Sequence, residues 1–304
     1  MPAKASPRKS AAKKDRPRDT AADVKYALAW LERRGTKKNR DGMARYAIVA
    51  KKVFGVSMTS MKSLAKELGR DHALSQALWK TGWYEARMLA SLVGEPARVT
   101  PAGMEQWAKG FDIWAVCDTA TFALWDRTPH AWPKVRDWSK RKEEFVKRAS
   151  FGMLASLTVH DKEAPDELYL EGLKLIEREA HDERNFVKKA VSWALRQIGK
   201  RNPRLRTAAM ACAERIAVQG TPSARFVATD ALRELQSDAV EKRQTAKAPR
   251  ASAPNGSSRR ATAPARSRAK AKPQPPASRA RAKAPSPAKG RTGPARPARS
   301  GRRS

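Results

Sequence analysis

Apolar side chains recur at the spacing of an α-helix from about residue 21 to residue 236. No stretch of the sequence shows the regular alternation of apolar and polar residues that a half-buried strand would need. Glycine, proline and aspartate residues divide the pattern into segments long enough to be separate helices. The sequence therefore predicts an all-α fold, with helices at residues 21–33, 42–54, 58–68, 72–80, 83–93, 101–109, 112–125, 132–139, 143–158, 165–178, 184–199, 203–217 and 223–235.

An internal repeat organises these helices. The segment Phe145–Ala149 (FVKRA) recurs as Phe186–Ala190 (FVKKA) and, more weakly, around Phe226. The three phenylalanines are 41 and 40 residues apart, which is the period of a two-helix HEAT-type repeat. Repeats of this kind stack on their neighbours to form a solenoid. We expect a HEAT-like α-solenoid of antiparallel helix pairs with a concave basic groove, flanked by disordered basic arms.

The segment from residue 186 to residue 199 separates its side chains into two stripes when it is wound as a helix. The apolar stripe contains Val187, Ala190, Val191, Ala194 and Ile198. The other stripe contains Lys189, Trp193 and Arg196, and Lys200 extends it by a turn. A tryptophan centred in a cationic face is better placed to meet a flat or anionic partner than to fill a core, and nucleic acid is both.

The repeat relates this cationic stripe to the preceding repeat. A shift of 41 residues maps Lys189 onto Arg148 and Trp193 onto Gly152. Two successive repeats are therefore predicted to present a cation at the same position facing the groove. One of them adds a tryptophan where the other leaves space.

The helix predicted over residues 112–125 also carries two stripes. Its core stripe contains Ile113, Val116, Cys117, Ala120 and Leu124, and its flank contains Trp114, Asp118, Thr121 and Trp125. Trp114 and Asp118 are neighbours on that flank because they are four residues apart. On spacing alone, the simpler interpretation is a tryptophan at the edge of the core beside a solvated carboxylate.

Charge is distributed unevenly along the 304 residues, whose formal net charge is +34. Residues 1–20 carry seven basic and two acidic side chains, and residues 242–304 carry nineteen basic and no acidic ones. The C-terminal segment is rich in alanine and proline and has too few apolar residues to form a core. We therefore expect a basic N-terminal arm at 1–20, a folded domain at 21–240 and a disordered tail at 241–304. Such a tail is suited to binding phosphate backbones, although a solubilising role is an alternative.

The remaining motifs exclude several classes of protein. The two cysteines, Cys117 and Cys212, lie in helical patterns and are expected to be small buried hydrophobic residues rather than a disulfide. The four histidines are scattered, and neither zinc-binding spacings nor glycine-rich phosphate loops occur. No apolar segment has the length of a signal sequence or a membrane span. We expect an intracellular protein that needs no metal and no cofactor.

Four segments in order resemble the HEAT-like DNA alkylation repair glycosylases of the 3-methyladenine/7-methylguanine type. They are Met43–Tyr46 with Phe54–Val56, Trp114–Asp118, Lys147–Ala149 and Phe186–Arg196. The last segment is long and specific, whereas the Trp-x-x-x-Asp segment alone would not be. The resemblance implies hydrolysis of the N-glycosidic bond of purines alkylated at N3 or N7 in duplex DNA, without flipping of the base.

The resemblance also implies roles for individual residues. Asp118 would support the developing sugar cation and the attacking water, and Trp114 and Trp193 would pack against the deoxyribose of the lesion. Arg148 would hold the DNA backbone, and we expect Lys188, Lys189, Arg196 and Lys200 to bind DNA as well. Tyr46 also matches a family position, but we interpret it as structural. The other seven tryptophans are expected to be packing residues.

Two other functions compatible with this sequence are a catalytically silent protein that binds distorted or branched DNA and a protein-binding HEAT scaffold. The set of Trp114, Asp118 and Trp193 favours the glycosylase, and the polycationic tail disfavours the scaffold. The expected partner is alkylated double-stranded DNA rather than a membrane, and the protein is expected to be a monomer. It would be cytoplasmic and nucleoid-associated in a bacterium, or nuclear in a eukaryote.

Overall fold

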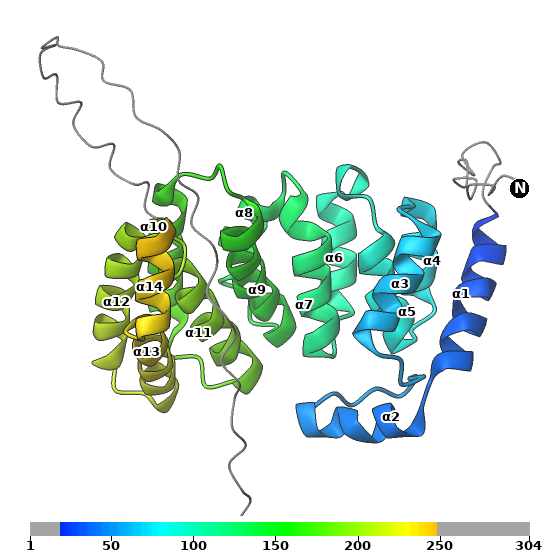
Figure 1. Ribbon diagram of the computed structural model, residues 1–304, viewed down its shortest axis with the longest axis horizontal. Coiled ribbons are helices and arrows are strands. Elements are labelled where there is room, and N and C mark those ends of the chain that lie inside the picture. The colour runs from blue at the N-terminus through cyan, green and yellow to red at the C-terminus, as the bar shows by residue number, and fades with distance from the viewer. Residues whose placement is uncertain (1–18, 248–304) are drawn as a thin grey trace, which may run out of the picture. The chain divides into compact units, whose positions relative to one another are not determined.

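The computed structural model describes residues 19–247, and this part of the chain is helical and contains no strand (Figure 1). Most of the expected basic arms, at 1–18 and 248–304, lie outside the described residues. The α-helices are α1 (Thr20–Arg34), α2 (Lys37–Met43), α3 (Met58–Leu68), α4 (His72–Lys80), α5 (Tyr84–Val93), α6 (Pro101–Lys109), α7 (Trp114–Ala123), α8 (Ala131–Trp138), α9 (Glu144–His160), α10 (Asp166–Glu179), α11 (Asn185–Gly199), α12 (Pro203–Ala217), α13 (Pro222–Leu235) and α14 (Asp238–Lys247). Short 3₁₀ turns occur at Ala44–Tyr46, Pro96–Arg98 and Trp125–Arg127. The all-α prediction is confirmed.

Several helices begin where a capping side chain accepts hydrogen bonds from the first turn. Ser57, Asp71, Thr100, Asn202 and Thr221 cap α3, α4, α6, α12 and α13 in this way. Proline occupies the first position of α6, α12 and α13, where its missing N–H costs no hydrogen bond. These local signals explain why the predicted ranges of α3, α4 and α6 agree with the structure to the residue.

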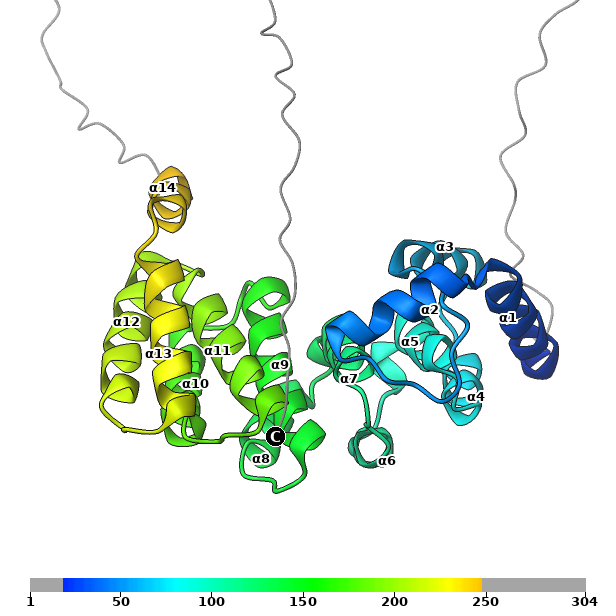
Figure 2. The same ribbon diagram turned by 90° about the horizontal axis from the view of Figure 1, so that it is seen from below.

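Alternate helices form a continuous row. Each of α3, α5, α7, α9, α11 and α13 packs against the next, and α4, α8 and α12 pack on α5, α9 and α13. Figures 1 and 2 show these helices side by side along the described domain. The repeat found in the sequence is visible in the contact of Phe145 with Phe186, whose ring centroids are 5.4 Å apart at equivalent positions of α9 and α11. The predicted stacking of helix pairs is confirmed.

The two predicted core stripes are buried. The five apolar residues of the α11 stripe are between 0 and 1% exposed, and those of the α7 segment are between 0 and 5% exposed. The seven packing tryptophans are buried or half-buried, and so are Cys117 and Cys212. Trp125, which the helical period placed beside Asp118, lies in the core because α7 ends at Ala123 and the chain turns there.

The helix predicted at 42–54 is wrong. The chain instead leaves the 3₁₀ turn at Ala47, which has a φ of 53°, and continues without helix to Ser57. The backbone N–H groups of Phe54, Gly55 and Val56 donate to the buried carboxylate of Glu85, at 3.0, 2.6 and 3.2 Å. These bonds satisfy in an extended segment the donors that a helix would have used internally. We call residues 47–57 the N-terminal strap.

Helix α14 crosses the domain boundary that the sequence suggested at residue 240. Val240 and Gln244 are buried, and the Gln244 side chain donates to the carbonyl oxygen of Gly199 at 2.9 Å. The folded domain therefore extends into the segment that was assigned to the basic tail. Among the described helices, none is both long enough and apolar enough to cross a membrane.

Candidate functional site

Three consecutive helices of the row bring the expected site residues together. Trp114 and Asp118 lie in the first half of α7, Arg148 lies near the start of α9, and Trp193 lies in the middle of α11. Trp114, Asp118 and Trp193 are half-buried, so each is held by packing and still reaches the surface. The arrangement follows from the repeat, because neighbouring helices of the row place equivalent turns side by side.

Asp118 and Arg148 form a two-pronged ion pair. Arg148 Nε donates to Asp118 Oδ1 at 2.9 Å, and Nη2 donates to Oδ2 at 2.6 Å. Nη1 of the same guanidinium donates to the carbonyl oxygen of Phe186 at 2.7 Å. Both side chains are largely shielded from solvent, with 19% of Asp118 and 7% of Arg148 exposed. Such bidentate pairs fix orientation as well as charge.

The surroundings of Asp118 shift the pKa of its carboxyl group. Burial raises the pKa of the Asp118 carboxyl above its ordinary value, and the charge and hydrogen bonds of Arg148 act in the opposite direction. Burial also raises the pKa of the neighbouring Cys117 thiol, which is fully enclosed. A carboxylate in these surroundings is weakly hydrated, and its charge therefore acts more strongly on any cation placed beside it.

Gly152 of α9 leaves the space in which Asp118 and Trp193 approach each other. A methyl group at this position would lie 3.7 Å from Asp118 Oδ1, 3.7 Å from Trp193 Cζ3 and 3.3 Å from Thr121 Oγ1. Glycine in the interior of a helix costs about 1 kcal/mol relative to alanine. The open space between the Asp118 carboxylate and the Trp193 indole is a physical reason for a glycine at position 152. It agrees with the sequence prediction that one repeat leaves space where the next repeat carries Trp193.

Trp114 is held by a residue far away in sequence. Its indole Nε1 donates to the carbonyl oxygen of Tyr46 at 2.8 Å. A cavity of about 340 Å³ opens here, between the N-terminal part of the domain and helices α7, α9 and α11. Its lining residues are Arg45, Tyr46, Ala47, Trp114, Arg148, Phe186 and Lys189. Asp118 does not line this cavity but contacts Arg148, which does.

Sequence reasoning missed part of this cavity. It treated Tyr46 as structural and assigned no role to Arg45 or Phe186, although all three line the cavity. The resemblance at Met43–Tyr46 was the available signal, but the helix expected over 42–54 placed this segment wrongly. Tyr46 is 69% exposed, so its ring is presented to solvent rather than packed in the core.

The five cations expected to bind DNA divide into two groups. Arg148 and Lys189 line the cavity, and Lys188 lies beside them on α11 with its Nζ 5.8 Å from the centre of the Phe226 ring. Arg196 and Lys200 instead pair with Glu234 of α13, at 2.7 and 2.6 Å. Arg196 also lies 3.2 Å from Asp230, so part of the positive charge of these two residues is offset within the protein, and their role in DNA binding remains a prediction.

No group of three or more His, Cys, Asp or Glu residues within 19–247 is arranged to hold a metal ion. Asp118 supplies the carboxylate of the candidate site, with the aromatic ring of Trp114 and the guanidinium of Arg148 beside it. This set can stabilise a developing positive charge and bind an anion next to it.

Comparison with known proteins places this geometry in context. A family model described as DNA alkylation repair enzyme matches residues 27–242. A solved structure resembles the chain with a TM-score of 0.59 and 18% sequence identity, over 69% of this chain and 94% of the other. It comes from a family of proteins related to the HEAT-like repeat DNA glycosylases, with affinity for branched DNA structures. At this identity the likeness shows the HEAT-like fold alone, and the search of curated proteins finds no match.

Proposed function

We propose, since the chain belongs to the DNA alkylation repair enzyme family, that it is a DNA glycosylase that releases N3- and N7-alkylated purines from duplex DNA. The observation that carries this proposal is the fixed carboxylate of Asp118, gripped by Arg148 and adjacent to two half-buried tryptophans. The resemblance in sequence adds that the base is released without being flipped into a pocket.

The chemistry requires little from the protein beyond a well-placed negative charge. A purine alkylated at N3 or N7 carries a positive charge and leaves as a neutral base, so no strong general acid is needed. The deoxyribose becomes cationic as the glycosidic bond breaks. A weakly hydrated carboxylate stabilises that charge electrostatically, because it need not reorganise during the reaction.

Asp118 retains the capacity for this role while it is paired with Arg148. A carboxylate has about four lone-pair sites, and Arg148 occupies one on each oxygen. The free sites can face the sugar cation and orient the attacking water. Trp114 and Trp193 offer aromatic faces to the same sugar, and each cation–π contact contributes about 0.5–2 kcal/mol.

Arg148 supplies both position and anion binding. Its guanidinium has five N–H donors, and three of them are used by Asp118 and Phe186. The other two can bind a phosphate at the cavity that Arg148 lines. Lys188 and Lys189 add charge on the next repeat, so a DNA backbone that crosses the cavity meets cations from α9 and α11 in turn.

The test is base release from methylated duplex DNA, measured as free 3-methyladenine and 7-methylguanine by chromatography. The wild-type chain should release base, and Asp118→Asn should lower the single-turnover rate by about 10²-fold or more while duplex affinity changes little. Asp137→Asn, which removes an exposed carboxylate from α8, is the matched control and should behave as wild type. Equal rates for Asp118→Asn and wild type would refute the assigned role.

A second candidate function is a DNA-binding protein without glycosylase activity. It is favoured by one observation, namely that both Asp118 oxygens accept hydrogen bonds from Arg148. The related structure with affinity for branched DNA is compatible with the same idea. Tight binding of a four-way junction together with no base release from any methylated duplex would support this candidate.

A further inference from the structure

A second cationic cavity lies away from the candidate site, between α3, α5 and the end of α7. Its volume is about 470 Å³. It is lined by Lys62, Ala65, Lys66, Gly69, Arg70, Leu92, Phe122, Ala123 and Arg127. We call it the α3–α7 cavity. No carboxylate is among these residues, so four cations converge there without an acid to neutralise them from within the lining.

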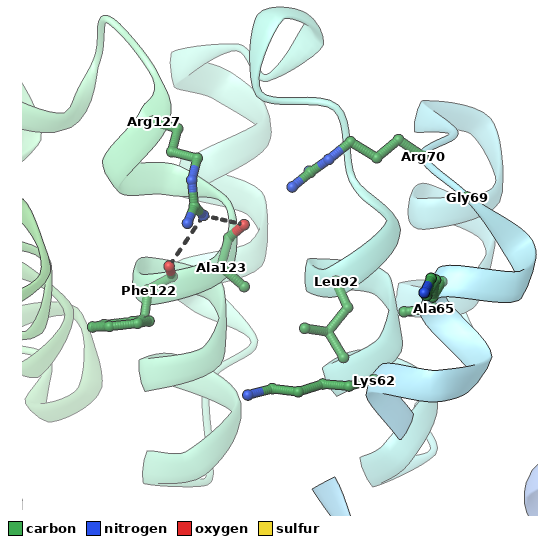
Figure 3. Close-up of a pocket in the computed structure, with 9 residues that line it drawn as sticks. Lys62, Ala65, Gly69, Arg70, Leu92, Phe122, Ala123 and Arg127 are labelled. Carbon is green, nitrogen blue, oxygen red and sulfur yellow. Dashed lines mark hydrogen bonds between the residues drawn. The ribbon is translucent and has the colours of Figure 1, made fainter. Parts of the chain in front are cut away.

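The lysines of this cavity are available to a ligand. Lys62 and Lys66 lie one turn apart on α3, both are exposed, and neither forms an ion pair with another residue in the range 19–247. Figure 3 shows Leu92 between Arg70, which extends toward Arg127, and Lys62, which extends toward α7. The ammonium groups of Lys62 and Lys66 are carried on flexible stems beside the aliphatic side chain of Leu92. They are suited to bind an anion whose oxygens accept hydrogen bonds.

The arginines are held in place by backbone carbonyl groups. Arg70 donates to the carbonyl oxygen of Gly94, and Arg127 donates to those of Ala123 at 2.8 Å and Phe122 at 3.2 Å. Each guanidinium thus keeps unused N–H donors after it has been positioned. Asp126, whose Oδ1 is 3.6 Å from Arg127, is fully buried and cannot screen the solvent side of the cavity.

The α3–α7 cavity and the candidate site share one helix. Asp118 lies in the middle of α7, and Phe122 and Ala123, which line the cavity, follow on the next turn. From Asp118 to Phe122 and Ala123 the helix rises by about 6–8 Å, and the cavity lies about one helix diameter to the side of α7. A separation of about 10–15 Å corresponds to about three to five base pairs of duplex.

We propose that the α3–α7 cavity binds a backbone phosphate of the DNA whose modified nucleotide lies at Asp118. The cations come from α3, from the loop directly after it and from the 3₁₀ turn after α7, and they line a common space, which suits a tetrahedral anion better than a flat base. The ring of Phe122 contacts His160 edge-on, at 4.5 Å between centroids, and points away from the gap in Figure 3. It is therefore not placed to stack on a base in the cavity, which favours a phosphate as the ligand. The inference rests on the proposed function in taking DNA as the ligand and in placing the modified nucleotide at Asp118.

The test removes the two unpaired lysines from the full-length protein. Lys62→Ala/Lys66→Ala should lower the magnitude of the slope of log affinity against log salt concentration for duplex DNA by about 1, the value for one neutralised phosphate. Lys109→Ala/Lys174→Ala is the matched control, because it removes two exposed lysines from α6 and α10 that line neither cavity. The control should leave the slope within about 0.5 of wild type. Equal slopes for the two double variants would overturn the proposal.

A second measurement locates the phosphate. Neutral methylphosphonate linkages, placed one at a time around a single modified nucleotide, should weaken wild-type binding at a position about three to five base pairs from it. The same linkage should have a smaller effect on Lys62→Ala/Lys66→Ala, because two of the four cations that would contact the phosphate have been removed. An equal effect in both proteins would overturn the proposal. Base release is measured separately, so a wild-type chain without glycosylase activity refutes the proposed function and leaves the salt-slope test intact.

Discussion

Both carboxylate oxygens of Asp118 accept hydrogen bonds from the guanidinium of Arg148, which lies on the next helix of the row. The two residues are 30 positions apart in sequence, and about nine-tenths of the arginine side chain is shielded from solvent. The pair therefore joins two successive repeats at the point where the chemistry is proposed to occur.

Removal of Arg148 alone should destabilise the protein, because it leaves a buried carboxylate without a partner. We expect Arg148→Met to lower the free energy of unfolding by about 3 kcal/mol and Arg148→Met/Asp118→Leu to recover most of that loss. Urea denaturation of the wild type, of these two variants and of Asp118→Leu gives the four free energies of unfolding that a double-mutant cycle needs. A double variant as unstable as Arg148→Met would show that the arginine stabilises the fold through other contacts, such as that with Phe186.

The pH dependence of base release should reflect the shifted Asp118. Burial raises the pKa of this carboxyl, and the reaction requires its ionised form. Activity should therefore be present above the raised pKa and lost as the pH falls through it, at a pH above that of an ordinary aspartate, about 3.9. Single-turnover rates, corrected for uncatalysed release at each pH, measure this acid limb. A limb centred at or below about 3.9 would contradict the expectation.

The space at Gly152 should matter more for activity than for stability. In Gly152→Ala the gain in helix propensity, about 1 kcal/mol, is offset by the tight contact with Thr121 Oγ1 at 3.3 Å. We expect the free energy of unfolding to change by less than about 1 kcal/mol, while base release falls because a methyl group occupies the space between Asp118 and Trp193.

Gly199→Ala is the control for this effect, since its methyl group would meet the side chain of Leu235 at 2.6 Å, far from the site. It should lower the thermal stability, with base release by the folded fraction unchanged. Gly152→Ala with full activity would show that the space is not used by the substrate.

The N-terminal strap should depend on Glu85. Its carboxylate accepts three backbone N–H groups, and a glutamine offers one acceptor oxygen beside an amide that donates. Glu85→Gln should lower the free energy of unfolding by about 1–3 kcal/mol and make the strap more accessible to proteases. Glu67→Gln, at an exposed carboxylate bonded to Tyr26, is the control. Unchanged proteolysis of the strap in Glu85→Gln would show that other contacts hold it.

The parts of the structure that sequence could predict are those that local pattern determines. The buried stripe of α11 follows from its helical period, and the starts of α3, α4 and α6 follow from their caps. The repeat placed Arg148 and Lys189 at equivalent positions, and both line one cavity. Each of these signals lies within one segment or at a fixed distance from it.

The parts that sequence could not predict depend on partners far along the chain. Residues 47–57 contain enough apolar side chains for a helix, but Glu85, about 30 positions later, binds their backbone instead. Arg196 and Lys200 lie on a cationic stripe, yet both pair with Glu234, which is 38 and 34 positions away on another helix. The helical period identifies which face of its helix a residue occupies, but it does not identify which residue of a neighbouring helix lies opposite.

Trp114 is bonded to Tyr46, and Trp193 approaches Asp118 only where α11 packs on α9. A nascent chain emerges from the ribosome with its N-terminal part first, and stacked repeats can fold as each neighbour appears. The strap and α7 can therefore dock well before α11 has been synthesised. A fragment that stops before Asn185 should retain stacked helices and the Trp114–Tyr46 bond yet lack Trp193, so the proposed catalytic set is completed only after α11 has been synthesised.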